Sequence, residues 1–347
     1  MHDLPLTGRA PQSLGRGRAA SANLEPILTQ QPPSVPALHP HYDALIARAR
    51  TLPPLRVAVV HPCNDVSLGA ALESAELGLI TPVMIGPRQK IEAAAEQLGR
   101  SLAGTLIIDA PHSHAAADAA VAMVLKGEVD ALMKGSLHTD ELMGAVVRRE
   151  GGLRTSRRIS HCFVMDVPGH DQPLIISDAA INIAPTLEEK ADIVQNAIDL
   201  AHALHLPAVR VAILSSMEIV NPKVPSTIDA AALCKMAERG QITGGQLDGP
   251  LAMDNAIDPE AARIKGIVST VAGQANVLIV PDLDAGNMLA KSLTFLAGAY
   301  SAGIVLGAKV PVILTSRADS EAARLASCAV ASMLAQAGRD KLIKAVG

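Results

Sequence analysis

Short runs of β-branched residues alternate with alanine-rich stretches from residue 55 onward, and this alternation limits the folds open to the chain. In the alanine-rich stretches, apolar residues recur at helical spacing. Such βα repeats are typical of parallel sheets covered by helices on both faces. The sequence therefore predicts an α/β fold. Strands are expected at 56–60, 82–85, 105–108, 131–133, 174–177, 209–214, 277–280 and 310–315. Helices are expected at 68–77, 90–98, 115–125, 187–204, 228–239, 259–265, 286–297 and 319–336.

The strands fall into two series, which suits a chain of 347 residues with two α/β domains. A cleft is expected where the carboxyl ends of the two sets of strands meet. Residues 1–45 differ from the rest, because they are rich in Pro, Ser, Gln and Gly and show no apolar periodicity. Such a segment buries too little apolar surface to offset its ordering entropy, so we predict a disordered extension. His39 and His41 within it are expected to be solvated rather than metal-bound.

Composition excludes several classes of partner. Aromatic residues make up 1% of the chain and the net charge is −4, so neither stacking platforms nor a basic field for nucleic acid are expected. The four cysteines are widely spaced and form no CxxC pair, which favours free thiols over disulfides or zinc. No apolar run reaches the roughly 18 residues that span a bilayer, and no signal-peptide core follows the N-terminus. We expect a cytoplasmic protein without membrane contact.

Common catalytic motifs are absent from the sequence. The first strand leads into His61 rather than into GxGxxG, and neither a Walker A sequence nor GxSxG nor HExxH occurs. Polar clusters at the junctions between strands and helices are the remaining candidates for a site.

Ser316 and Arg317 form the first of these clusters, directly after the strand expected at 310–315. The next helix would begin with Asp319 or Ser320 as its cap. A helix N-terminus carries unpaired N–H groups, and an arginine fork matches phosphate oxygens, so the junction suits an anion. The local alternative is an ordinary capped helix whose Arg317 pairs with a surface carboxylate.

Two further clusters are basic. Lys134 follows a short apolar strand, His138 lies close behind it, and Thr139 is a candidate cap for the next helix. His138 alone is more typical of a structural histidine than of a catalyst. Residues 154–161 hold three arginines, which suit either a solvated face or a rim that grips phosphate groups.

Together these clusters resemble the phosphate acetyltransferase/phosphate butyryltransferase family from about Leu55 to the C-terminus. Seven stretches in the right order carry the resemblance. They are 132–139 (LMKGSLHT), 158–161 (RISH), 176–182 (ISDAAIN), 248–254 (DGPLAMD), 271–276 (VAGQAN), 281–287 (PDLDAGN, with Lys291 after it) and 315–317 (TSR).

The resemblance implies two α/β domains like those of isocitrate and isopropylmalate dehydrogenases, with an interdomain cleft. It places the first domain at 46–172 plus 316–347 and the second, inserted domain at 173–315. It also implies a homodimer or higher homo-oligomer. Coenzyme A and acyl-CoA, with inorganic phosphate and acyl phosphate, would be the substrates, and no metal or cofactor is needed.

The implied reaction is reversible transfer of an acetyl or other short acyl group between coenzyme A and phosphate. By the resemblance, Arg317 and Arg158 hold the phosphoryl group and Ser316 donates to the developing oxyanion. The remaining polar residues of the matching stretches are candidates for binding phosphate or coenzyme A. They are Lys134, His138, Thr139, Ser160, Asp178, Asn287, Lys291, Asp319 and Glu321.

The sequence departs from the acetyltransferase pattern at Ala323, where a catalytic aspartate is usual. In this local segment it is closer to the butyryltransferase branch and to the acetyltransferase-like half of fusions with a hydratase domain. Asp319, Glu321 and His138 are alternative bases for the thiol proton of coenzyme A. Acyl length is set by a small apolar pocket, so acetyl and butyryl both stay open.

Two rival readings remain. A metal- and NAD-dependent hydroxyacid dehydrogenase of related fold would need a cluster of acidic residues. Candidates for that cluster are Asp248, Asp254, Asp282 and Asp284. The second rival is a sensor that binds coenzyme A and has lost its base, and Ala323 motivates it.

Overall fold

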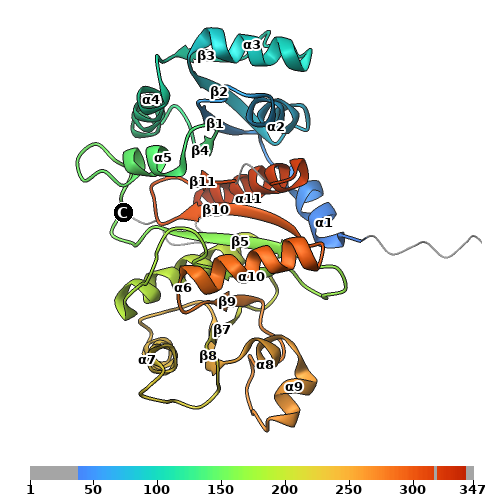
Figure 1. Cartoon of the computed structure of the whole chain (residues 1–347), viewed down its shortest axis with the longest axis vertical. Coiled ribbons are helices and arrows are strands. Elements are labelled where there is room, and N and C mark those ends of the chain that lie inside the picture. The colour runs from blue at the N-terminus through green and yellow to red at the C-terminus, as the bar shows by residue number, and fades with distance from the viewer. Residues whose placement is uncertain (1–37, 316–318, 341–347) are drawn as a thin grey trace, which may run out of the picture. The chain divides into compact units, whose positions relative to one another are not determined.

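The computed structural model describes residues 38–315 and 319–340. Its framework is an eleven-stranded mixed sheet with the order β3-β2-β1-β4-β11-β10-β5-β6-β9-β7-β8 (Figure 1). The strands are β1 Leu55–Val60, β2 Ile80–Gly86, β3 Leu106–Asp109, β4 Ala131–Lys134, β5 Ser160–Asp166, β6 Leu174–Ser177, β7 Arg210–Leu214, β8 Gln246–Leu251, β9 Val277–Ile279, β10 Tyr300–Leu306 and β11 Val312–Ile313.

Pairing is parallel on both sides of this sheet and antiparallel at its centre. The strands β3, β2, β1, β4 and β11 pair in parallel, as do β6, β9, β7 and β8. Between the two groups, β10 pairs antiparallel with β11 and β5, and β5 pairs antiparallel with β6. The prediction of parallel sheets is right for the two sides and wrong for the centre. Because three antiparallel pairings separate them, the strands of the two sides run in opposite directions.

Helices cover both faces of the sheet. They are α1 Pro40–Ala49, α2 Asp65–Glu76, α3 Arg88–Leu98, α4 Ser113–Leu125, α5 Thr139–Val146, α6 Leu187–Ala203, α7 Pro225–Glu238, α8 Met253–Ile257, α9 Pro259–Ile264, α10 Leu283–Leu296 and α11 Glu321–Arg339. One face carries α2, α3, α6, α7 and α11 over a single continuous apolar core. The other face has two separate cores, one under α4 and α5 and one under α8, α9 and α10. The second face is therefore less completely covered near its middle.

Aliphatic side chains fill these cores, as the sparse aromatic content requires. Every residue of β4 is buried, and so is every residue of β6. Strands buried on both faces need continuous apolar runs, which is the pattern found in the sequence. The sheet continues without a break from β5 to β6, and the division into domains at 46–172 plus 316–347 and 173–315 stays a prediction.

Helix α1 corrects the predicted extension 1–45, because the helix begins at Pro40. Its apolar residues Tyr42, Leu45 and Ile46 lie at helical spacing and pack on the continuous core. His39 is buried and stacks on the ring of Tyr300, with the ring centroids 3.6 Å apart. This contact also corrects the expectation of a solvated His39.

Candidate functional site

A cavity of about 570 Å³ opens on the second face of the sheet, over its central strands. Its floor comes from β5, β10 and the end of β11, and its walls come from α5 and α10. It lies where the cores under these two helices leave the sheet uncovered. The lining residues are Lys134, Leu137, His138, Thr139, His161, Phe163, Ala180, Asn287, Ala290, Lys291, Thr294, Phe295, Ser301, Leu314, Thr315 and Asp319.

Lys134 is the last residue of β4 and lies in the wall of the cavity with only 7% of its surface exposed. Its Nζ is 3.4 Å from the carbonyl oxygen of Gly135. An ammonium group removed from water is favoured only beside negative charge or several acceptors. Lys134 thus places a positive charge in a part of the cavity wall that is largely removed from water.

Helix α5 brings His138 and Thr139 to the rim of the cavity. His138 is the N-cap residue, and its backbone N–H donates to Glu141 Oε2 at 2.7 Å. Thr139 is the first residue of the helix, so the prediction that it is the cap is wrong. Both residues are exposed.

Helix α10 supplies Asn287 and Lys291 to the opposite wall. Asp282 caps this helix by accepting a hydrogen bond from the N–H of Ala285 at 2.9 Å. Asn287 Nδ2 donates to the carbonyl of Ala179 at 3.2 Å, which ties the helix to the loop after β6. Gly286 permits the close approach, because a Cβ there would lie 2.7 Å from the carbonyl oxygen of Asp178.

Asp178 and Arg158 belong to a polar network that is absent from the cavity lining. Buried Asp178 accepts hydrogen bonds from the backbone N–H groups of Ala180, Ile181 and Asn182. Arg158 Nε donates to Asn182 Oδ1 at 2.7 Å, and its guanidinium forms an ion pair with Glu189. These contacts hold the loop after β6 in place.

Ser160 and Arg157 are also engaged inside the protein. Ser160 is fully buried, and its Oγ accepts a hydrogen bond from Asn196 Nδ2 at 2.8 Å. The Arg157 guanidinium is largely buried against the carboxylate of Asp199 on α6. The two neighbouring arginines thus differ, since Arg157 is mostly buried and the side chain of Arg158 is 46% exposed.

His161 was not among the predicted site residues, although it lies in one of the seven matching stretches. Its side chain is buried on the cavity floor, edge-on to the Phe163 ring. It forms a hydrogen bond with the backbone carbonyl of Leu314, and its Nδ1 has no hydrogen-bond partner among the described residues. We therefore assign the N–H of the uncharged ring to Nε2. Gly303 makes room for this contact, because a Cβ there would lie 2.5 Å from Leu314 O and 3.1 Å from His161 Nε2.

Burial lowers the pKa of His161 from 6.5 to about 4, although Asp178 and the Leu314 carbonyl act in the opposite direction. The unfolded chain binds a proton at this residue below about pH 6.5, and the folded chain does so only near pH 4. The contribution to stability is complete above pH 6.5 and is lost as pH falls toward 4, by on the order of 3 kcal/mol. The ring is uncharged at neutral pH.

We expect that His161→Asn will reduce the acid sensitivity of folding, because an amide donor can replace Nε2–H but cannot titrate. Urea unfolding of both proteins at pH 7 and pH 5 measures the effect. The loss of unfolding free energy between the two pH values should be smaller in the variant. An equal loss would contradict a titrating role for His161.

The start of α11 borders the same cavity. Asp319 lines it, and Ser320 caps the helix by accepting a hydrogen bond from the Ala323 N–H. Ala323 is buried. Glu321 is absent from the lining and shares a hydrogen bond with Glu73 of α2, which raises the pKa of Glu73 to about 7. Ser316 and Arg317 lie outside the described residues.

The structure thus brings together six of the predicted site residues and leaves others apart. Those in the cavity lining are Lys134, His138, Thr139, Asn287, Lys291 and Asp319. Those outside it are Arg158, Ser160, Asp178 and Glu321. His161, Phe163 and Thr294 line the cavity without having been predicted to do so. The cavity combines buried and exposed cations, a neutral imidazole and apolar walls, which suits an anionic substrate with an apolar part.

Comparison with known proteins agrees with these features. Residues 114–332 match the family model described as phosphate acetyl/butaryl transferase. A phosphate acetyltransferase of Rhizobium meliloti is 62% identical over 311 residues, which cover 90% of this chain and 98% of that protein. A phosphate butyryltransferase of Clostridium beijerinckii is 38% identical, covering 85% of this chain and 98% of that protein. A branched-chain phosphotransacylase from Enterococcus faecalis V583 has a similar structure, with a TM-score of 0.71, 28% identity, and coverage of 81% and 99%.

These matches define an acyltransferase class on a mixed α/β sheet. The chain belongs to the phosphate acetyl/butaryl transferase family. In residues 38–315 and 319–340, no helix is long and apolar enough to cross a membrane.

Proposed function

We propose that this protein transfers an acetyl group reversibly between coenzyme A and inorganic phosphate. The observation that carries the proposal is the cavity over the central strands, where a buried lysine meets polar residues of the family's stretches. The proposal is supported by membership of the family and by 62% identity to a protein named phosphate acetyltransferase. Coenzyme A enters as a substrate, and no resident cofactor is part of the proposal.

Acetyl is preferred over butyryl as the transferred group. Identity is 62% over 311 residues to the phosphate acetyltransferase and 38% over 295 residues to the phosphate butyryltransferase. The sequence of residues 316–321 is closer to the butyryltransferase branch and favours butyryl, but this segment is short. Phosphate butyryltransferase activity is the second candidate. Phe163, Phe295 and Leu314 line the cavity, and side chains of this kind would limit the length of the acyl group.

The proposed chemistry needs charge neutralisation and one proton transfer. Phosphate attacks the thioester carbonyl, the C–S bond breaks, and the proton of hydrogen phosphate ends on the thiol of coenzyme A. Lys134 and Lys291 would reduce the charge of the incoming phosphate. The family resemblance adds Arg317 and Arg158 at the phosphoryl group and Ser316 at the oxyanion.

In the reverse direction, from acyl phosphate to coenzyme A, a base must accept the thiol proton of coenzyme A, and we propose three candidates for it. Asp319 and His138 line the cavity, which supports both. Glu321 has less support, because it is hydrogen-bonded to Glu73 and is absent from the lining. Binding roles for Thr139 and Asn287 fit their place in the walls. Ser160 and Asp178 are buried and bonded within the protein, so we propose for them a supporting role.

The wider expectations from the resemblance stay part of the proposal. They are an arrangement of two domains like that of isocitrate and isopropylmalate dehydrogenases, an interdomain cleft, a homodimer or higher oligomer, and a cytoplasmic location. The sheet topology is compatible with the first of these, because parallel strands lie on both sides of β10 and β5.

The four aspartates considered for a metal- and NAD-dependent dehydrogenase give that hypothesis little support. Asp254 pairs with Lys265, Asp282 caps α10, and Asp248 Oδ1 accepts a hydrogen bond from the N–H of Gly249. Within the described part of the chain, no three His, Cys, Asp or Glu side chains are grouped so as to hold a metal ion. The sensor reading predicts binding of coenzyme A without turnover.

A thiol-release assay separates these possibilities. We expect phosphate-dependent release of coenzyme A from acetyl-CoA, with kcat/KM falling through propionyl-CoA to butyryl-CoA. Each added methylene should lower kcat/KM by about tenfold or more, because one methylene changes the binding free energy in a fitted apolar pocket by about 1–3 kcal/mol. Activity should persist with EDTA and without NAD. Faster reaction with butyryl-CoA would favour the second candidate, and binding without turnover would favour the sensor.

A further inference from the structure

Thr315 is a residue of the cavity over the central strands that has no role in the proposed chemistry. It lies two residues after β11, is only 7% exposed and lines the cavity. Its hydroxyl has no hydrogen-bond partner within residues 38–315 and 319–340, and unlike Nδ1 of His161 it is not sealed from solvent. A hydroxyl that is largely removed from water and lacks an internal partner is stabilised by a ligand that offers an acceptor.

Lys134 and Thr315 lie at the carboxyl ends of two neighbouring parallel strands. Strand β11 pairs with β4 so that Ile313 lies level with Met133. Continued by one residue, this register places Leu314 level with Lys134, and Thr315 follows directly. Both Lys134 and Thr315 line the cavity and are largely buried. The fold therefore brings an ammonium group and a hydroxyl to the same part of the cavity, at the edge where parallel strands commonly bind ligands.

Hydrogen bonds to two strands hold the chain just before Thr315. The N–H of Leu314 donates to the carbonyl of Gly303 on β10 at 3.3 Å, and the carbonyl of Leu314 accepts from His161 on β5. The N–H of Gly303 donates in turn to the buried hydroxyl of Ser327 on α11 at 2.9 Å. Because Leu314 is held by both strands, Thr315 has a fixed place in the cavity. A donor that is fixed before the substrate arrives needs little reorganisation during the reaction.

We propose that Thr315 is a phosphate-binding residue whose hydroxyl donates a hydrogen bond to the phosphate beside Lys134. This inference rests on the proposed function and adds a neutral donor to the cations assigned there to the phosphate. Phosphate matches both groups, because its several oxygens can accept a hydrogen bond from the hydroxyl and a charge-assisted one from the ammonium group. A thioester carbonyl has one oxygen with little charge, so it has less need of the ammonium group.

Thr315→Val tests this role, because valine has nearly the shape of threonine and lacks the hydroxyl. In the thiol-release assay with the full-length protein, it should raise KM for phosphate by about tenfold or more, the usual effect of losing a hydrogen bond to a charged group. KM for acetyl-CoA should change by no more than about twofold, since the hydroxyl is not assigned to the thioester. Thr315→Ser keeps the hydroxyl and should stay within about threefold of the original KM for phosphate. A variant that only perturbed the structure would raise both KM values.

Thr294→Val is the matched control. Thr294 lines the same cavity from α10, and its hydroxyl already donates to the carbonyl of Ala290 at 3.0 Å. Its replacement should raise KM for phosphate much less than Thr315→Val does. Equal rises in the two variants, or an unchanged KM in a folded Thr315→Val protein, would overturn the proposal.

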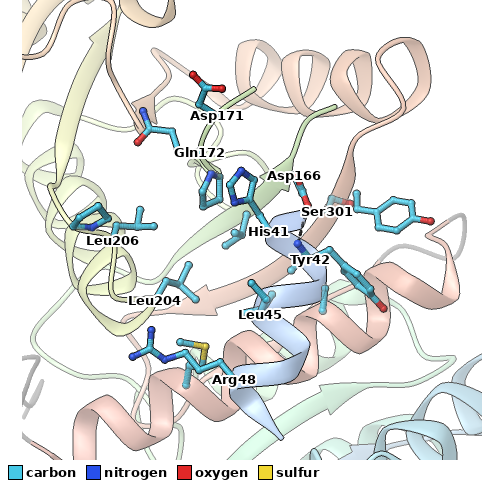
Figure 2. Close-up of a pocket in the computed structure, with 18 residues that line it drawn as sticks. His41, Tyr42, Leu45, Arg48, Asp166, Asp171, Gln172, Leu204, Leu206 and Ser301 are labelled. Carbon is cyan, nitrogen blue, oxygen red and sulfur yellow. Dashed lines mark hydrogen bonds between the residues drawn. The ribbon is translucent and has the colours of Figure 1, made fainter. Parts of the chain in front are cut away.

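Tyrosine emission checks that each variant is folded. The two tyrosines of the chain, Tyr42 and Tyr300, line a different cavity beside α1, and neither lines the cavity over the central strands (Figure 2). The backbone N–H of Tyr42 donates to Asp166 Oδ2 at 2.7 Å, so Tyr42 reports on the packing of α1 against the sheet. If Thr315→Val does not fold, Thr315→Ala takes its place in every comparison.

Binding of inorganic phosphate alone separates this inference from the proposed function. A ligand that binds only the folded protein raises the unfolding temperature as its concentration increases. Phosphate without coenzyme A should do so for the original protein and for Thr315→Ser, and Thr315→Val should need about tenfold more phosphate for the same rise. This result in the absence of acyl transfer would refute the proposed function and support the phosphate site. Acyl transfer with an equal phosphate requirement in all three proteins would refute the site and leave the proposed function in place.

Discussion

Replacement of Lys134 by methionine is expected to lower kcat/KM for phosphate by roughly 10²–10³-fold, the usual effect of removing one charge-stabilising donor from an active site. Lys134 is 7% exposed and lines the cavity proposed for acyl transfer. Methionine has a similar length and no charge, so the cavity wall is retained while the cation is lost. Initial rates of coenzyme A release at varied phosphate concentration measure the effect.

Lys126→Met is the matched control for this experiment. Lys126 is exposed at the C-cap of α4 and does not line the cavity, so its replacement should leave kcat/KM unchanged. Tyrosine emission and circular dichroism check that both variants are folded. A folded Lys134→Met protein with rates within threefold of the original would show that Lys134 is not needed for phosphate.

Replacement of Arg157 by methionine is expected to destabilise the protein by about 3–5 kcal/mol, the usual loss when one partner of a buried ion pair is removed. The side chains of Arg157 and Asp199 are 14% and 12% exposed. The variant leaves the Asp199 carboxylate buried without its guanidinium partner. Urea unfolding at pH 7 measures the loss.

Arg148→Met provides the comparison for an exposed pair. Arg148 lies 2.7 Å from Asp118, and both side chains are about half exposed. Solvent-exposed pairs of this kind contribute about 0–1 kcal/mol, so the unfolding midpoint should hardly move. Similar losses in Arg157→Met and Arg148→Met would contradict the structural role of the buried pair.

The sequence predicts the two sides of the sheet well and its centre poorly. Apolar runs identify β1, β4 and β6, because strands buried on both faces are mostly apolar. Strands β5 and β10 at the centre were missed, and so was β8 at one edge of the sheet. Strand β5 begins with Ser160 and His161, and β10 contains Ser301 and Gly303, so neither forms an uninterrupted β-branched run. Their antiparallel pairing joins distant parts of the chain and has no local signal.

The candidate site shows the same limit. Lys134 ends a strand, and His138 and Asp319 lie just before helices, so all three are polar residues at the end of an apolar run or near a helix start and are visible in the sequence. His161 and Phe163 lie within β5, and their exposure to the cavity depends on how α5 and α10 leave the sheet uncovered. That arrangement is a property of tertiary packing. The roles of Ser316 and Arg317 still come from the family resemblance alone.

The contrast between the cavity's floor and its walls has a consequence for how such proteins can change. Floor residues Phe163 and Ser301 come from the two antiparallel strands, whereas Lys134, His138 and Lys291 come from the flanking strand–helix units. The volume of the cavity can therefore change by substitution on β5 and β10, while the charged side chains keep their positions on the neighbouring elements. Selection for a longer or shorter acyl group can therefore change residues of β5 and β10 while the charged residues of the walls stay the same.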